Sequence, residues 1–351
     1  HTRAIMDITV TITTVNRADH LAAGLQALAE QDFPKSDFEI IVADNGSIDH
    51  TKEVCDKFAA QFENFTFIYD ARPGQLIGWH RALEIAQGDI TCFIDDDVCP
   101  EPSWLSGIHE AYQNPEVGLA TGPIKLEFDT PPPDWLNHLT LGDPGAQTLP
   151  AFGLLDCGNE VREIPGNFVW GSNFTVRKSC LEEVHGFHPG AMSSQLLKFC
   201  GDAEIHVGRS VEALGYEVLY HPQASVRHHI SSNRVTLEAI KAKFITAGHA
   251  RSFQTLRQMG GPYELPGEEE FRQIALRYFR DPEQAPAELF QIIENGLTEG
   301  IATHLQSFAE DMAFRDWVLH DNFLDLDKCY VHPELLKDNT NTNEADWRSG
   351  Q

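Results

Sequence analysis

The sequence predicts an α/β protein in which helices flank a mostly parallel sheet, followed by a helical C-terminal extension. Over the first hundred residues, short β-branched apolar runs alternate with segments whose apolar residues recur at helical spacing. This order is typical of parallel strands joined by right-handed crossovers. From Ser231 onward the apolar residues keep a helical period. With 351 residues and 42% hydrophobic side chains, the chain can bury a sizeable core.

Four strands are expected in the first half of the chain. Residues 8–15 form a continuous β-branched run, as in a strand that is buried on both faces. The other three strands are expected at 38–43, 65–69 and 90–94. Helices are expected between them, at 19–31, after His50 and at 78–86. Asp19 stands where it would cap the first of these helices.

The second half of the chain is less regular. Strands are expected within 117–128, at 167–176 and at 217–221, and a helix at 201–214. Residues 129–165 are rich in Pro and Gly and have no periodicity. A connection of this length is expected to be a lid, a binding loop or an excursion from the sheet.

The charge and the cysteines exclude several classes of protein. The chain has 26 Lys and Arg against 53 Asp and Glu, a formal charge of −27, so non-specific binding of nucleic acid is not expected. No apolar run approaches the roughly 20 residues of a membrane span. The first five residues resemble a remnant ahead of a start at Met6, without the apolar segment of a signal peptide. Seven scattered Cys without a CxxC pair favour reduced thiols and a cytoplasmic location.

Polar side chains follow each of the four predicted strands. Ligands of such sheets bind at the carboxyl ends of the strands, so these side chains predict one ligand site. No GxGxxG pattern follows the first strand and there is no Walker motif, so a conventional dinucleotide site or a P-loop is not expected. The polar residues at these strand ends include Thr13, Asn16, Arg17, Asp44, Gly46, Arg72, Asp95, Asp96 and Asp97.

The three consecutive aspartates are the most informative of these residues. They directly follow the apolar run 90–94, so they begin where the sheet ends. Carboxylates this close repel one another unless a cation lies among them. Oxygen ligands suit Mg²⁺ or Mn²⁺, which often bridges a diphosphate. The sequence therefore predicts a divalent metal at this strand end.

Five segments together resemble the family-2 glycosyltransferases, which have the GT-A fold. They are ITTVNR (12–17), VADNGSID (42–49), ARPG (71–74), FIDDDV (93–98) and GDAEI (201–205), and His228 and His229 follow them. The resemblance covers about residues 6–232 and implies a GT-A type, Rossmann-like sheet. A nucleotide-binding half at about 6–105 and an acceptor half at about 106–232 would follow, with a helical region at 233–338 and a flexible tail at 339–351.

The resemblance implies a role for each part of this edge of the sheet. The nucleotide-sugar donor would be bound by Thr13, Asn16, Arg17, Asp44, Gly46, Arg72, Asp95 and Asp96. Asp97 would be the direct metal ligand, joined by His228 or His229, with His228 preferred. The donor sugar and the acceptor would meet Trp170, Gly171 and Asn173. A UDP-sugar is favoured, with GDP- and dTDP-sugars as alternatives.

The catalytic base is expected in the segment 201–205. Asp202 matches the family's base, but the family usually has Glu-Asp where this chain has Gly201 and Asp202. Glu204 is the rival, and on a helix the two would point in different directions, so only one can face the donor. One base without a covalent nucleophile implies a single displacement and inversion at the anomeric carbon.

Two other functions stay open at this point. A sugar-phosphate nucleotidyltransferase would share the sheet and the acidic metal site, but should show a Gly-rich basic loop where this chain has 14–17. An inactive, transferase-like scaffold would bind a partner through its acidic helical tail; the intact Asp97 and Asp202 argue against it, and the departure at Gly201 keeps it open. For a transferase, a carbohydrate or lipid-linked acceptor is expected, and the synthesis of a polysaccharide or a glycolipid and the glycosylation of a protein all stay open. Contact with a membrane surface would then be peripheral.

Overall fold

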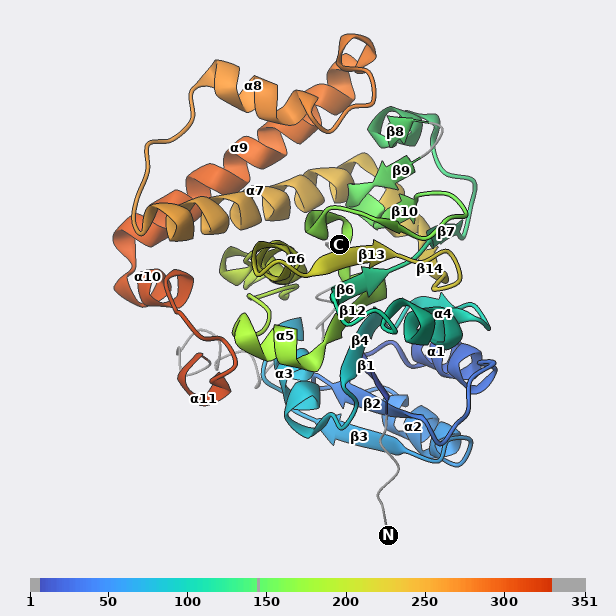
Figure 1. Cartoon of the computed structure of the whole chain (residues 1–351). Helices are drawn as coiled ribbons and strands as arrows, with labels where there is room; N and C mark the ends of the chain where they lie inside the picture. The colour runs from blue at the N-terminus through green and yellow to red at the C-terminus, as the bar shows by residue number, and fades with distance from the viewer. Residues whose placement is uncertain (1–6, 144–145, 330–351) are drawn as a thin grey trace.

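The computed structural model describes residues 7–143 and 146–329 and shows two sheets, with long helices packed at one end (Figure 1). The larger sheet has eight strands in the order β11-β13-β6-β12-β4-β1-β2-β3. They are β1 (Ile8–Thr14), β2 (Phe38–Asp44), β3 (Phe65–Tyr69), β4 (Ile90–Asp95), β6 (Val117–Thr121), β11 (Arg162–Glu163), β12 (Phe174–Arg177) and β13 (Glu217–Tyr220). The first four are parallel, which confirms the predicted sheet, whereas β12 is antiparallel to both β4 and β6.

The register of β1 fixes where the polar strand ends meet. Thr14 lies opposite Asp44 of β2, and Thr13 lies opposite Asp95 of β4. Every residue of β1 is buried, as the continuous β-branched run predicts. The polar residues that follow these three strands therefore share one edge of the sheet.

Helices cover this sheet on both sides. They are α1 (Ala18–Ala29), α2 (Thr51–Ala59), α3 (Gln75–Ile85), α4 (Trp104–Ala111), α5 (Lys178–Glu183) and α6 (Ala203–Ala213). α1 and α2 lie on one side and α3 on the other (Figure 1), as right-handed crossovers require. The predicted cap of α1 was wrong: Asp19 lies inside the first turn, and the Asp49 carboxylate accepts the hydrogen bond from the Ala18 N–H at 3.1 Å.

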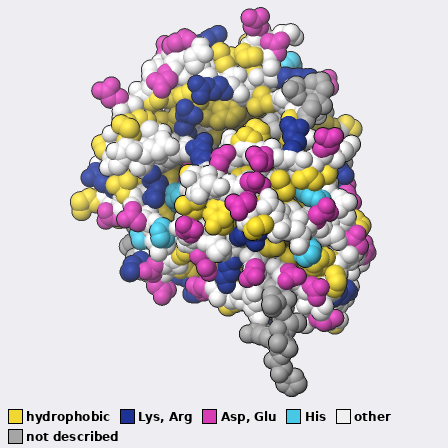
Figure 2. Space-filling model, in the orientation of Figure 1, with side chains coloured by type: hydrophobic (Ala, Val, Ile, Leu, Met, Phe, Trp, Pro, Cys, Tyr) yellow, Lys and Arg dark blue, Asp and Glu magenta, His cyan; other side chains and the backbone are white. Residues whose placement is uncertain are grey.

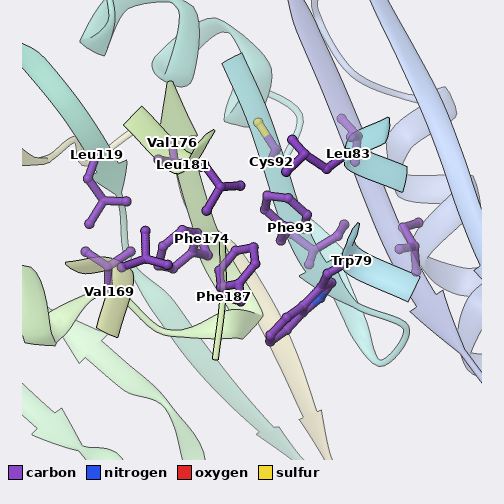
Figure 3. Packing of buried hydrophobic residues seen from close by; sticks show 14 of the residues in the cluster. Trp79, Leu83, Cys92, Phe93, Leu119, Val169, Phe174, Val176, Leu181 and Phe187 are labelled. Carbon is purple, nitrogen blue, oxygen red and sulfur yellow. The ribbon is translucent and has the colours of Figure 1, made fainter. Parts of the chain in front are cut away.

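Aromatic side chains pack against β4 and β12 beneath the polar edge. The ring of Phe187 lies 4.5 Å from that of Trp79, 4.8 Å from that of Phe93 and 5.2 Å from that of Phe174, measured between centroids (Figure 3). Phe93 belongs to β4 and Phe174 to β12, so this cluster holds the two strands together. It fixes the strand that carries the aspartates.

The smaller sheet was not predicted. Its order is β5-β14-β7-β10-β9-β8, with β5 (Val98–Pro100), β7 (Ile124–Phe128), β8 (Leu141–Asp143), β9 (Ala146–Leu149), β10 (Leu154–Asp156) and β14 (Val226–Ile230). The Pro/Gly-rich segment 129–165 supplies β8, β9 and β10, and is therefore a folded excursion. Its short 3-10 helices are η1 (Asp134–Leu139) and η2 (Pro150–Phe152). The strand expected at 167–176 begins only at Phe174, after η3 (Gly166–Phe168) and η4 (Gly171–Asn173).

The C-terminal region is helical up to residue 329, as predicted, and residues 330–338 of the expected helical region lie outside the described residues. It contains α7 (Leu237–Met259), α8 (Glu268–Leu276), α9 (Ala287–Glu310), α10 (Met312–Val318) and α11 (Leu326–Cys329), with η6 (Ser232–Val235) and η7 (Pro282–Gln284); η5 (Leu197–Phe199) precedes α6. α7 and α9 cross closely, because a Cβ added at Gly300 would lie 2.1 Å from the Ile245 carbonyl oxygen. The expected tail 339–351 lies outside the described residues. Within the described ranges, no helix has both the length and the hydropathy that crossing a membrane requires.

Candidate active site

A cavity of about 260 Å³ opens at the carboxyl ends of β1 and β4. Three parts of the chain that are distant in sequence form its wall. The end of the larger sheet contributes Arg17, Asp95 and Asp97; the middle of the chain contributes Phe152, Trp170, Gly171 and Glu204; the last part contributes His228, Arg234, Lys243 and Thr246. Trp79 and Gln75 of α3 close the cavity on the side of the aromatic cluster.

Asp97 and His228 face each other in this cavity. The Nε2 atom of His228 lies 3.5 Å from Oδ1 of Asp97, and both side chains are buried. The Nδ1 atom lies 3.0 Å from the Phe152 carbonyl oxygen, which can only accept, so Nδ1 carries the proton. In the neutral ring, Nε2 then presents a lone pair to a carboxylate. A cation between these two acceptors would be bound by both, and carboxylate and imidazole are suitable ligands for a divalent metal.

His229 lies on the opposite face of β14. Its Nε2 atom is 2.5 Å from Oδ1 of Asp129, and its ring is 4.9 Å from the ring of His20. The alternation of side chains along a strand separates the two neighbouring histidines. Of the two histidines, only His228 lines the cavity.

Two arginines neutralise the aspartates. Arg17 lies 2.8 Å from Oδ2 of Asp97 and 3.3 Å from Oδ1 of Asp96, and Arg234 approaches the same Asp97 oxygen at 3.3 Å. Burial lowers the pKa of Arg17, but the attraction of Asp96 and Asp97 outweighs it, so that the pKa is raised. Asp95 accepts a hydrogen bond from Nε2 of Gln75 at 2.9 Å. The two arginines thus offset much of the negative charge of the aspartate cluster.

The protein alone does not complete a metal shell. Across residues 7–143 and 146–329, no group of three or more His, Cys, Asp and Glu side chains is arranged to hold a metal ion. Asp97 and His228 offer two donors, and Mg²⁺ and Mn²⁺ commonly take their remaining ligands from water and substrate phosphates. The donor set fits an ion that binds together with a diphosphate.

The residues expected to contact the nucleotide form the turns beside the cavity. Oδ1 of Asp44 accepts hydrogen bonds from the N–H groups of Gly46 and Ser47 at 3.0 and 2.8 Å, and burial raises the pKa of Asp44. Asn16, with φ of 53°, accepts from the Ile48 N–H at 2.8 Å and so joins the turn after β1 to that after β2.

Three more of the expected residues lie outside the cavity wall. Arg72 forms an ion pair of 2.7 Å with Asp70. Thr13 is buried at the end of β1, where Nε2 of Gln75 lies 3.5 Å from its hydroxyl oxygen. Asn173 is fully buried and bonds to Nε1 of Trp104 at 2.9 Å, which makes it part of the core. Of the residues expected near the sugar, Trp170 and Gly171 line the cavity.

The two candidate bases have different surroundings. Asp202 is 8% exposed, and its Oδ1 lies 2.6 Å from Nδ1 of His188, whose ring stacks on that of His206 at 3.6 Å. Burial would raise the pKa of Asp202, but the hydrogen bond from His188 outweighs it, so the pKa is lowered. Asp202 precedes α6, yet its side chain does not cap the helix. Of the two carboxylates, only Glu204 lines the cavity.

Glu204 is held against the backbone of Gly171, which lines the same cavity. Its Oε1 atom accepts a hydrogen bond from the Gly171 N–H at 3.1 Å. Burial raises the pKa of Glu204, and the charges of Asp95 and Asp202 raise it further. A carboxylate with a raised pKa on the wall of a cavity has the properties of a general base.

Several cavity residues were not identified from the sequence. Arg234, Lys243 and Thr246 come from η6 and α7, outside the motifs that carry the family resemblance. Phe152 comes from the excursion. Their approach depends on how the C-terminal helices pack against the smaller sheet, and local sequence carries no signal for that contact.

Comparisons with known proteins identify a family and several relatives of the chain. The model of "Glycosyl transferase family 2" matches residues 9–184, half of the chain. Glycosyltransferase AglE of Haloferax volcanii is 25% identical over 211 residues, which are 54% of this chain and 69% of that protein. Glucosyl-dolichyl phosphate glucuronosyltransferase of the same organism is 21% identical over 260 residues, 72% of this chain and 78% of that protein.

A solved structure has the same fold. The mannosyltransferase PcManGT of Pyrobaculum calidifontis, in complex with GDP-Man and Mn²⁺, is 18% identical, with a TM-score of 0.52 over 90% of this chain and 84% of that chain. The fold is thus of the GT-A type, as the motifs imply. The family match covers half of the chain, including the strands that carry the aspartates, and shows that the chain belongs to glycosyl transferase family 2 and is a glycosyltransferase.

Proposed function

We propose that the protein transfers a sugar from a nucleoside-diphosphate sugar to an acceptor hydroxyl, with inversion at the anomeric carbon and with a divalent metal. One observation carries the proposal: Asp97 and His228 present facing acceptors in a cavity that is also lined by a separate carboxylate, Glu204. A metal-assisted displacement needs both parts in one cavity. A sugar-phosphate nucleotidyltransferase lacks support, because the family match is to glycosyltransferases.

Asp97 and His228 would hold the metal. A bound Mn²⁺ or Mg²⁺ would supply Lewis-acid stabilisation of the charge that develops on the leaving diphosphate. The Phe152 carbonyl fixes the His228 tautomer that leaves Nε2 able to coordinate. Arg17 and Arg234 hold the Asp97 carboxylate in place through Oδ2, while Oδ1 faces His228.

We assign the proton transfer to Glu204. The family resemblance points to Asp202, but Asp202 is bound to His188 and does not line the cavity, whereas Glu204 does. The Gly171 N–H positions one oxygen of Glu204. The other carboxylate oxygen can then accept the proton of the acceptor hydroxyl while the oxygen of that hydroxyl attacks the anomeric carbon. The sugar–phosphate bond breaks in the same step and the diphosphate leaves. A single displacement of this kind inverts the anomeric configuration.

The donor and the acceptor are proposed only as classes. A UDP-sugar is favoured, and a GDP-sugar is supported by the mannosyltransferase structure that holds GDP-Man and Mn²⁺. The relative named for glucosyl-dolichyl phosphate supports a lipid-linked sugar as acceptor, and a polysaccharide is the alternative.

A thermal-shift screen tests the proposal. Each of UDP-, GDP-, dTDP- and CMP-sugars is added with MnCl₂ and with EDTA, because a ligand that binds only the native state raises the melting temperature. At least one sugar nucleotide is expected to raise it with Mn²⁺ and much less with EDTA. Equal shifts in the two conditions for every ligand contradict the metal site, and no shift at all contradicts the donor class.

A further inference from the structure

We propose that Lys243, on the C-terminal helix α7, binds the diphosphate of the donor. The residue lies outside the part of the chain that the family model matches, residues 9–184. The inference rests on the proposed function, since it assumes a nucleoside-diphosphate sugar in this cavity. It assigns the helical region a direct part in the reaction.

The position of Lys243 is set by Phe152. The Nζ atom lies over the Phe152 ring, 5.6 Å from its centroid, and the carbonyl of the same Phe152 holds His228. The ammonium group and the proposed metal ligand therefore both contact Phe152. Thr246, one turn further along α7, also lines the cavity, so this face of the helix forms its wall.

Lys243 differs from the other cations of the cavity in its partners. Arg17 and Arg234 are both engaged by Asp97. Among residues 7–143 and 146–329, no carboxylate forms an ion pair with Lys243. Its ammonium group makes a cation–π contact with the ring of Phe152. A cation–π contact leaves the N–H donors of an ammonium group able to bind an anion. Burial, together with Arg234, lowers the pKa of Lys243 to about 7, and an anion bound beside it would stabilise the ammonium form and raise the pKa again.

The electrostatics of the cavity favour a diphosphate as that anion. Asp95, Asp97 and Glu204 line the cavity, and the whole chain carries a formal charge of −27. Acidic side chains are also spread over the face shown in Figure 2. A diphosphate entering this field needs positive groups beyond the metal, and arginines already held by Asp97 offer less. Lys243 supplies such a group beside the metal ligands, where the phosphates must lie if the ion bridges them.

The test compares nucleotides with and without the second phosphate. For UDP and GDP, and for UMP and GMP, dissociation constants with MnCl₂ are measured by calorimetry for the wild-type protein, Lys243→Met and Lys243→Arg. A charged hydrogen bond of this kind contributes roughly 10- to 100-fold in affinity. Lys243→Met is expected to weaken diphosphate binding by about that factor and monophosphate binding less, and Lys243→Arg is expected to retain most of it.

Lys241→Met is the matched control. Lys241 lies on the same helix, is exposed and pairs with Glu299 at 3.0 Å, so its loss should leave nucleotide binding unchanged. If Lys243→Met unfolds, Lys243→Gln takes its place, with the helical circular dichroism signal as the check. A purely structural role would weaken diphosphate and monophosphate binding equally, and that result overturns the inference.

The remaining outcomes separate this inference from the proposed function. If the wild-type protein binds neither diphosphate, the proposed function fails, and the inference with it. If it binds one, and Lys243→Met binds it within twofold of the wild-type constant, only the inference fails. If binding of the diphosphate is unchanged but binding of a UDP-uronate falls, the lysine contacts a sugar carboxylate, and the assignment to the diphosphate is wrong.

Discussion

Exchanging each candidate base for its amide should have different effects at the two positions: Glu204→Gln should mainly lower kcat, and Asp202→Asn should mainly lower stability. In the wild-type protein, the Gly171 N–H donates to the Glu204 carboxylate at 3.1 Å. In Glu204→Gln the amide oxygen can still accept this hydrogen bond, but the side chain can no longer accept the proton of the acceptor hydroxyl. A general base contributes roughly 10²–10⁴-fold to the rate. We therefore expect kcat to fall by about that factor while donor affinity is kept.

The stability of the two variants should also differ in sign. Burial raises the pKa of Glu204, so its ionised form destabilises the fold above the unfolded-state pKa, and Glu204→Gln should be at least as stable as wild type at pH 7. The pKa of Asp202 is lowered by the hydrogen bond from His188, so that stabilisation is present at pH 7 and is lost as pH falls. Burial lowers the pKa of His188 to about 4, so the bond at pH 7 joins a neutral ring to a carboxylate.

The size of the Asp202 effect follows from that bond. A hydrogen bond to a charged group contributes about 1.5–3 kcal/mol and a neutral one about 0.5–1.5 kcal/mol. Asp202→Asn exchanges one for the other, so we expect a loss of about 1–1.5 kcal/mol and a fall in melting temperature of roughly 2–5 °C. Its kcat should change less than that of Glu204→Gln.

Steady-state transfer kinetics and thermal unfolding at pH 7 measure both variants. The dependence of kcat on pH adds a third reading: activity should fall as pH drops through the raised pKa of Glu204, and Glu204→Gln should lose this limb of the profile. A slow Asp202→Asn together with a fast Glu204→Gln would refute the assignment and move the base to the position that the family pattern indicates. Normal rates in both would refute the single displacement itself.

Asp97→Ala should abolish the difference between Mn²⁺ and EDTA in nucleotide binding while the circular dichroism spectrum is kept; a surviving difference would exclude Asp97 as a ligand. His228→Ala should reduce Mn²⁺-dependent binding far more than His229→Ala, since only His228 lines the cavity, and calorimetry with MnCl₂ and nucleotide would reveal the reverse order. Gly300→Ala should lower the melting temperature, because the new Cβ would lie 2.1 Å from a backbone oxygen and overpacking costs about 1–3 kcal/mol; an unchanged value would mean that the helices separate freely.

The sequence predicts best where local pattern decides the structure. The four parallel strands followed from apolar runs of five to eight residues, each closed by polar residues, and the place of Asp97 followed from the end of the last run. These features need no knowledge of distant contacts.

Other features depend on contacts between segments far apart in the chain. Strands β8 to β10 are only three or four residues long, too short for a period to be recognised. His188 donates a hydrogen bond to Asp202, which lies 14 positions further along the chain. Lys243 approaches the ring of Phe152, which lies 91 positions before it. Whether Asp19 or Asp49 caps α1 was likewise decided by the neighbouring loop, since both lie within reach of its first turn.

The way the cavity is assembled matters for any attempt to divide or recombine the protein. A fragment cut to the family match would end at residue 184, before His228, Arg234 and Lys243, and would lack one wall of its reaction chamber. A chimera that exchanges the C-terminal helices between relatives would also exchange side chains that line the cavity. Because α7 is seated on α9 at the distance that glycines permit, the two helices would have to be transplanted as a pair.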